Sequence, residues 1–124
     1  MTIIEAIISV DAITPNTYTQ GEKIRWLSNL DGNIKAEIID THEGHEAVEF
    51  EGYTEITPID TVLLIPSPYD DIYTSWLQMQ IDYANGEFNK FNNSSAIYNS
   101  RYAAFERYYN RTHMPLTKHT TKYF

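Results

Sequence analysis

The sequence predicts a mainly α fold, a small bundle of about four helices with a short β-hairpin or strand pair inserted between helices two and three. Two observations predict it. Apolar residues recur every three or four positions along four segments, which is typical of amphipathic helices, whereas residues 40–66 show no helical period. The length of 124 residues, of which 42% are hydrophobic, suits a single domain spanning 1–124 with one core.

The first helix is expected to begin after Thr2, whose side chain can cap it, and to end before Pro15. Its isoleucines at positions 3, 4, 7 and 8, with Val10, form a broad apolar face. Although residues 1–14 are apolar, Glu5 and Asp11 interrupt them and no basic flank precedes them, so a signal peptide is not expected.

The second helix is predicted over about Gln20 to Ile39. Thr19 and Glu22 have the spacing of a capping box, in which each side chain bonds the backbone of the other residue. Gly32 lies inside the segment, and a glycine in a helix interior costs about 1 kcal/mol. Because the apolar spacing stays in phase on both sides of Gly32, we expect one helix, with any break falling there.

Between the second and third helices, two short segments have strand-like patterns. Apolar and acidic residues alternate from Ala47 to Tyr53, and Thr61 to Ile65 is a short apolar run closed by Pro66. These patterns predict the inserted hairpin or strand pair.

The third helix is predicted to follow the Pro66-Ser67-Pro68 segment, capped by Ser67 or Asp70, and to end or kink at Gly86. Trp76 is expected on its buried side. The fourth helix, Glu87 to Tyr109, carries a regular seam of mostly aromatic residues at three- and four-residue steps: Phe88, Phe91, Ser95, Tyr98, Tyr102, Phe105 and Tyr109.

That fourth helix would be a rod of about 34 Å, whereas a compact chain of this length has a radius of gyration of about 14 Å. Its far end, followed by a tail over residues 110–124, is therefore expected to project from the body. The seam has two interpretations. Aromatic residues can simply fill the core, but each tyrosine hydroxyl needs a partner or water, which favours an interface with another chain between Tyr98 and Phe124.

Charge is distributed unevenly. The segment 40–71 holds nine acidic residues and no Lys or Arg, whereas 101–124 holds five basic residues against Glu106 alone. Such runs can be no more than two solvated surfaces. Alternatively, the basic end of one copy approaches the acidic middle of another. With a formal charge of −8, the chain is not expected to bind nucleic acid in general.

No motif in the sequence predicts catalysis, and we expect neither an enzyme nor a bound cofactor. His42 and His45 lie three residues apart with a glycine between them, unlike the helical zinc motif that needs a spacing of four. A metal site there is a weak alternative to a solvated turn. Asp70 and Asp71 are better explained as acids complementing a helix dipole than as a catalytic pair. The longest strictly apolar run, Val62 to Ile65, is too short for a membrane span.

Several segments are similar to one protein family. Residues 64–73 (LIPSPYDDIY), 81–87 (IDYANGE), 91–93 (FNN) and 109–115 (YNRTHMP) resemble head-to-tail connector proteins, also called adaptor or head-completion proteins, of tailed phages and prophages. Residues 24–44 resemble the same group, so the likeness covers most of the chain.

This resemblance implies a structural virion protein, present in the host cytoplasm before assembly, that forms a dodecameric ring beneath the portal and joins capsid to tail. Its partners would be the portal protein, neighbouring copies of itself and a downstream tail-completion protein, while DNA passes non-specifically through the channel. The family's portal contact corresponds to Tyr109 to His113 and the residues after them. Together with the tyrosine seam, this nominates the following partner-binding residues: Tyr102, Tyr109, Asn110, Arg111, Thr112 and His113.

Two other classes of function remain open. The chain could be a small regulatory or inhibitory protein that binds one partner through its tyrosine-rich C-terminal helix. The weaker alternative is a metal-dependent enzyme built on His42, His45 and neighbouring acids.

Overall fold

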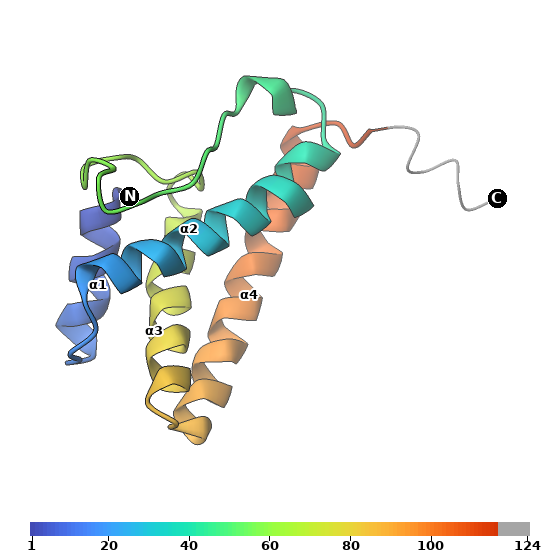
Figure 1. Ribbon diagram of the computed structural model, residues 1–124. Helices are drawn as coiled ribbons and strands as arrows, with labels where there is room; N and C mark the ends of the chain where they lie inside the picture. Colours follow the sequence, from blue (N-terminus) through green and yellow to red (C-terminus); the bar gives the residue numbers. More distant parts are fainter. Residues whose placement is uncertain (117–124) are drawn as a thin grey trace.

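The computed structural model describes residues 1–116 and contains the four expected α-helices (Figure 1). Three single turns of 3₁₀ helix, η1 to η3, interrupt the connections. The helices are α1 (Ile3–Ile13), α2 (Gln20–Glu37), α3 (Ile72–Ala84) and α4 (Phe88–Thr112), and the 3₁₀ turns are η1 (Ile39–Thr41), η2 (His45–Ala47) and η3 (Tyr69–Asp71).

The first two helices begin as the sequence predicts. In α1 the Glu5 amide donates to the Thr2 hydroxyl at 3.2 Å and the Thr2 amide donates to the Glu5 carboxylate at 2.8 Å. Thr19 and Glu22 form the same reciprocal cap at the start of α2. Helix α2 passes through Gly32 without a break, which confirms the single helix that the apolar spacing predicts.

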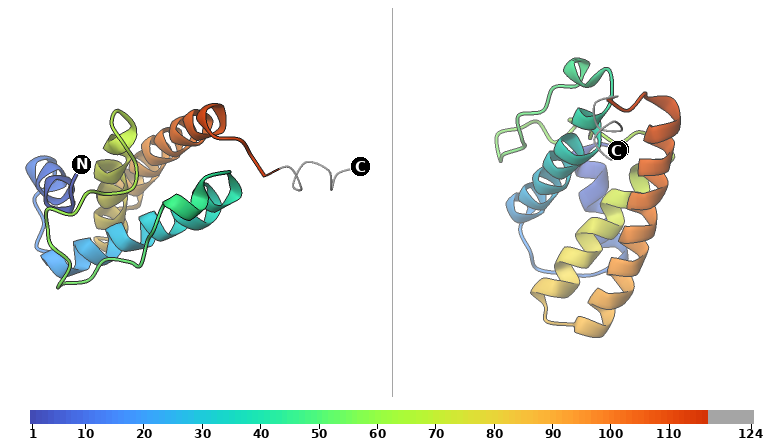
Figure 2. Two further views of the ribbon diagram at one scale, coloured as in Figure 1. Left: turned by 90° about the horizontal axis from the view of Figure 1, so that it is seen from above. Right: turned by 90° about the vertical axis from the view of Figure 1, so that its right-hand side faces the viewer.

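Helix α3 is the centre of the bundle. It contacts α1, α2 and α4, whereas the backbones of α1 and α4 do not approach each other within the described chain. Figure 2 shows α2 crossing one side of α3, with α1 and α4 on either flank. All four helices contribute to one hydrophobic core, in which Tyr73, Leu77 and Phe105 are almost completely buried.

The prediction of a β-hairpin or strand pair is wrong. Residues 1–116 form no strand, only two isolated bridges, Thr2 with Val62 and His42 with Pro115. The strand-like segments do not pair because their backbone groups have other partners. The Tyr53 amide donates to the Ser28 hydroxyl of α2 at 2.9 Å, and the Leu63 amide donates to the Met1 carbonyl at 3.0 Å.

Asp31 of α2 holds this connection, residues 48–66, against the bundle. Its side chain is completely buried and accepts three hydrogen bonds, from the Tyr53 hydroxyl at 2.6 Å, the Tyr73 hydroxyl at 2.6 Å and the Leu64 amide at 3.1 Å. Tyr73 in turn accepts from the Ile65 amide at 2.8 Å. Burial raises the pKa of Asp31, although each of these hydrogen bonds acts in the opposite direction.

The C-terminal end of α4 does not project as expected. Phe105 and Tyr109 are buried in the core, where Tyr69 of η3 packs against Phe105 and His42, directly after η1, packs against Tyr109. The chain then turns back, and Glu43 donates its amide to the Met114 carbonyl at 2.8 Å while Leu116 donates to the Thr41 carbonyl at 3.1 Å. Residues 110–116 of the expected tail therefore belong to the body, and residues 117–124 lie outside the described chain.

Trp76 is only half-buried and lies at the edge of the core, not in its centre as expected. Its indole N–H donates to the Trp26 carbonyl of α2 at 2.7 Å, and its ring lies against Tyr98 of α4 with centroids 5.1 Å apart. Trp76 thus joins three helices. None of the described helices combines the length and the apolar character that crossing a membrane requires.

Candidate functional site

The tyrosines expected to meet a partner are largely covered by the chain itself. Tyr109 is only 7% exposed, and its ring stacks on His113 with centroids 3.8 Å apart. Tyr102 is half-buried and donates its hydroxyl to Glu37 of α2 at 2.8 Å. Tyr98 lies against Trp76, and burial raises the pKa of Tyr98 to about 12. The aromatic seam is therefore mainly a contact between helices of one molecule.

His42 explains why Tyr109 is enclosed. The imidazole is buried and meets the Tyr109 ring edge-on, with centroids 5.0 Å apart. One of its nitrogens, Nδ1, lies 2.6 Å from the Ile38 carbonyl, and Nε2 lies 2.7 Å from the Asn110 side chain. Both nitrogens are thus engaged within the fold, which ties η1 to the last turns of α4.

The two histidines of the weak metal motif do not converge. His42 faces the core, whereas the His45 ring lies 3.2 Å from Glu46 at the surface. Asp40 pairs with Lys35 and is 3.9 Å from His45. Across the described residues, no group of three or more potential ligands could hold a metal ion.

The remaining predicted partner residues form a short surface at the end of α4. Asn110, Arg111 and Thr112 are exposed, and His113 is half-buried against Tyr109. Arg111 forms no ion pair with any described residue, so its guanidinium is available to an acidic partner. These residues lie together, but only this exposed part can contact a partner without unfolding the end of α4.

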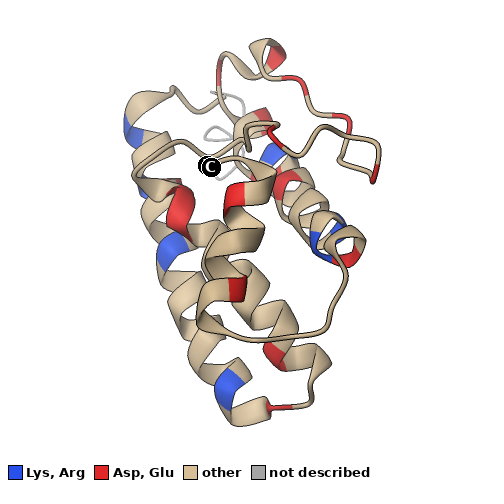
Figure 3. Cartoon of the chain, turned by 90° about the vertical axis from the view of Figure 1, so that its left-hand side faces the viewer, with Lys and Arg blue, Asp and Glu red and all other residues tan. Residues whose placement is uncertain are grey.

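Two charged surfaces stand out once the chain is folded. We call residues 43–60 the acidic loop, because its acids are all exposed: Glu43, Glu46, Glu49, Glu51, Glu55 and Asp60. We call the set Lys90, Arg101, Arg107 and Arg111 the basic strip of α4. Figure 3 shows the Lys and Arg positions of α4 along one side of the molecule and most of the acidic loop on a different side.

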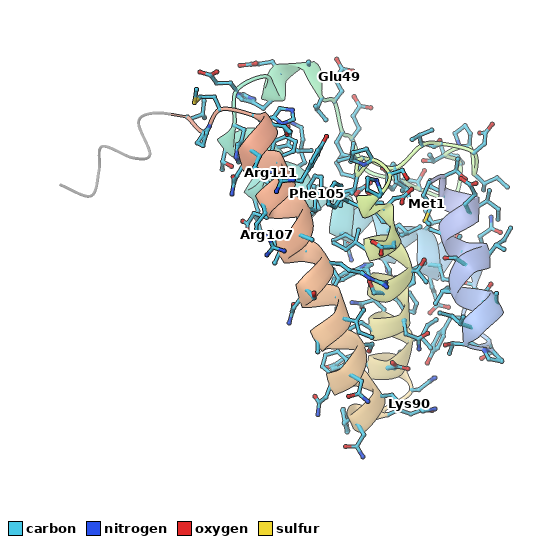
Figure 4. The ribbon with its side chains drawn as sticks, turned by 180° about the vertical axis from the view of Figure 1, so that it is seen from behind. Met1, Glu49, Lys90, Phe105, Arg107 and Arg111 are labelled. Atoms are coloured by element: carbon cyan, nitrogen blue, oxygen red, sulfur yellow. The ribbon has the colours of Figure 1, made fainter. Side chains whose placement is uncertain are left out.

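The basic strip is partly neutralised. Lys90 pairs with Glu87 at 2.8 Å, and Arg101 pairs with Asp71 at 3.2 Å. Arg107 is exposed and, like Arg111, forms no ion pair within the described chain. The charge available for a partner is therefore concentrated toward the C-terminal end of α4, where Figure 4 shows both arginines.

The fold also exposes several large apolar side chains. The most exposed is Ile56, at 92%, in the acidic loop. Ile13 of α1 and Ile97 of α4 are also exposed, and so is Ile8, which the sequence places on the apolar face of the first helix. A signal was present in α1, because a helix with isoleucine on several faces is usually covered on more than one side.

Comparison of this chain with protein-family models, with curated proteins and with solved structures finds no match.

Proposed function

We propose that this chain is a structural subunit that assembles head to tail into a ring at the portal vertex of a tailed phage and joins the capsid to the tail. The observation that supports it most directly is that most of the acidic loop runs along α2 whereas the basic strip runs along α4, so that the two charged surfaces face different sides of the subunit (Figure 3). When two complementary surfaces lie on different sides, successive copies can repeat the same contact, and a closed ring results if the rotation closes.

The sequence resemblance to head-to-tail connector proteins supplies the rest of the proposal. It spans most of the chain, and the small helical bundle is the kind of subunit that it implies. On this proposal the partners are the portal protein, neighbouring copies and a downstream tail-completion protein. DNA would pass without specific contacts, since a chain with a net charge of −8 offers few cations to phosphates.

The tyrosine seam does not support an assembly role, because the chain's own helices cover Tyr98, Tyr102 and Tyr109. The portal contact is therefore assigned to the exposed residues Asn110, Arg111 and Thr112 and to residues 117–124, which bring Lys118 and Lys122. Basic groups at this end would favour an acidic surface on the portal.

A truncation tests this assignment. The cut belongs after Leu116, because residues 114–116 hydrogen-bond to residues 41–43 and their loss would disturb the fold. We expect the protein lacking 117–124 to keep its unfolding midpoint but to stop co-sedimenting with the portal protein encoded in the same genome. Replacing Lys118 and Lys122 by Gln in the full-length chain separates the effect of charge from that of length.

The outcome distinguishes the competing functions. A truncated protein that still co-sediments with portal would overturn the assignment of the contact to this end. A full-length protein that binds as one copy and never forms a larger assembly would instead favour a regulatory or inhibitory binding protein.

A further inference from the structure

A groove runs over the side of α3 that α2 leaves uncovered. In Figure 1 α2 lies in front of α3, and Figure 4, drawn from behind, shows α3 between α1 and α4 with no described element over it. The groove has a volume of about 180 Å³ and is lined by Ile13, Thr74, Ser75, Gln78, Ser94, Ile97 and Arg101. Small-molecule pockets usually measure roughly 300–1,000 Å³, so this one suits a side chain better than a ligand.

The polar groups on the groove floor already have partners. Thr74 hydrogen-bonds Ser9 of α1 at 2.6 Å, and Gln78 bonds both Thr14 and the buried Asp82. Ser94 donates to Asp82 at 2.9 Å. Because these groups need no further donor or acceptor, the groove can accept an aliphatic side chain without leaving a buried polar group unpaired.

The rims of the groove are apolar and exposed. Ile13 of α1 is 64% exposed and Ile97 of α4 is 49% exposed. Arg101 of the basic strip also lines the groove and is paired with the exposed Asp71 at 3.2 Å. Exposed isoleucines beside an arginine favour an occupant that joins an aliphatic side chain to an acidic neighbour, which can share Arg101 with Asp71.

The tip of the acidic loop has that chemistry. Ile56, 92% exposed, follows directly after Glu55 and is held in a tight turn. The Thr57 amide donates to the Thr54 carbonyl at 3.1 Å, and the Thr54 amide donates to the Thr57 hydroxyl at 2.9 Å. Tyr53, just before the turn, is anchored to Asp31. The turn therefore presents Ile56 in a preorganised position, which lowers the entropy cost of binding.

The turn and the groove lie on different sides of the subunit. The acidic loop runs along the outer side of α2, as the view from above shows (Figure 2), whereas the residues that line the groove belong to α1, α3 and α4. One molecule therefore cannot fill its own groove, and a second copy offers the matching turn.

We propose that the Ile56 turn of one copy inserts into the groove between α1, α3 and α4 of the next copy. Ile56 packs between Ile13 and Ile97, which brings the acidic loop of one copy toward Arg101 of the next. The inference rests on the proposed function, because it names the contact between neighbouring subunits of the ring. The contact is heterologous, so an open chain of copies keeps one free turn at one end and one free groove at the other until the ring closes.

Cysteine crosslinking tests the contact, and the chain has no cysteine of its own. Thr54→Cys introduces a thiol at the turn, and Ser100→Cys introduces one at the outer rim of the groove. Both substitutions leave Ile56 and Ile97 in place. With a short bismaleimide, and with portal present as a template, a mixture of the two variants should give a covalent dimer. The Thr54→Cys/Ser100→Cys double variant should give a ladder of larger oligomers. Asn99→Cys replaces Ser100→Cys as the matched control, because Asn99 is exposed in the same helical turn but faces away from the groove.

Substitution gives a second, independent test. Ile56→Asp should weaken self-association roughly 10- to 100-fold, since burying an isoleucine contributes about that factor, and Ile97→Asp should do the same. Ile8→Asp, at an exposed isoleucine outside the turn and groove, should have no such effect. Mixing Ile56→Asp with Ile97→Asp leaves one intact turn and one intact groove, so the mixture should form a 1:1 dimer although neither variant associates alone.

Different results would disprove the subunit contact and the proposed function. If the unmodified protein forms rings but crosslinking does not exceed the Asn99→Cys control, this contact is wrong and the proposed function stands. If the unmodified protein forms no assembly even with portal, both are wrong.

Discussion

Asp31 is the residue on which the long connection between α2 and α3 most depends. It is a carboxylate without exposure to water, and its partners are two tyrosine hydroxyls and one backbone amide, with no cation paired to it among residues 1–116. The hydrogen bonds favour the ionised form, whereas burial favours the protonated form. Burial is the larger effect, because the pKa of Asp31 is raised.

Replacing Asp31 by Asn tests its role in stability. An amide has one acceptor oxygen instead of two, so at least one of the three donors loses its acceptor in a buried site. We expect a loss of about 1–3 kcal/mol in the free energy of unfolding, measured with urea. Asp60→Asn, at an exposed acid of the same loop, should change stability by less than about 0.5 kcal/mol. Equal effects of the two substitutions would contradict the anchoring role.

The raised pKa of Asp31 predicts how this loss depends on pH. The Asp31 carboxyl holds its proton more tightly in the folded chain than in the unfolded chain, so the protonated form stabilises the folded state. This contribution is complete below the pKa of the unfolded chain, about 3.9, and is lost as pH rises through the higher pKa of the folded chain. The difference in unfolding free energy between the unmodified protein and Asp31→Asn should therefore shrink from acidic to neutral pH. A difference that grows over this range would mean that the hydrogen bonds outweigh burial.

Substitutions at Tyr109 and Arg111 distinguish a residue that stabilises the fold from a residue that contacts a partner. Tyr109→Ala removes a ring enclosed by His42, Phe105 and His113, and should cost about 3 kcal/mol or more. Arg111→Ala should change stability by less than about 0.5 kcal/mol and weaken portal binding instead. Thermal unfolding and co-sedimentation measure the two effects. If Tyr109→Ala is as stable as the unmodified protein but no longer binds portal, Tyr109 contacts the portal and does not mainly stabilise the fold.

At the scale of the elements, local signals predicted the helices well and the connection poorly. The Thr2 and Thr19 capping boxes are short-range patterns, so their sequence spacing was enough to place the starts of α1 and α2. The alternation from Ala47 to Tyr53 only requires that one side of an extended segment be buried. It does not say whether a second strand or a helix covers that side, and here Ser28 and Asp31 of α2 take the place of a strand.

The contribution of Trp76 to stability tests whether α3 packs against α2 and α4 as described. Trp76→Ala removes the hydrogen bond to α2 and the ring contact with Tyr98 of α4. Because the side chain is half-buried, we expect a loss of about 2–3 kcal/mol, below the roughly 3–5 kcal/mol typical of fully buried aromatic residues. Urea unfolding measures it, and a loss below about 1 kcal/mol would mean that α3 does not pack as described.

For the whole molecule, the regular aromatic seam of α4 was predictable, but what covers it was not. Tyr102 and Tyr109 could meet either a partner or the chain's own helices, and only the position of α2 and η1 decides between them. The charge asymmetry was also visible in the sequence. Its arrangement on different sides of the subunit emerges only when most of the acidic loop folds along α2 and the basic strip lines α4.

The ring proposal is tested most directly by mixing this protein with its proposed partner, a phage portal protein, and measuring the mass of any complex that forms. Native mass spectrometry or sedimentation of the purified complex gives the number of bound copies. We expect a full ring of copies, bound all or none, on each portal assembly. Portal assemblies that carry only scattered single copies, or none, would contradict it.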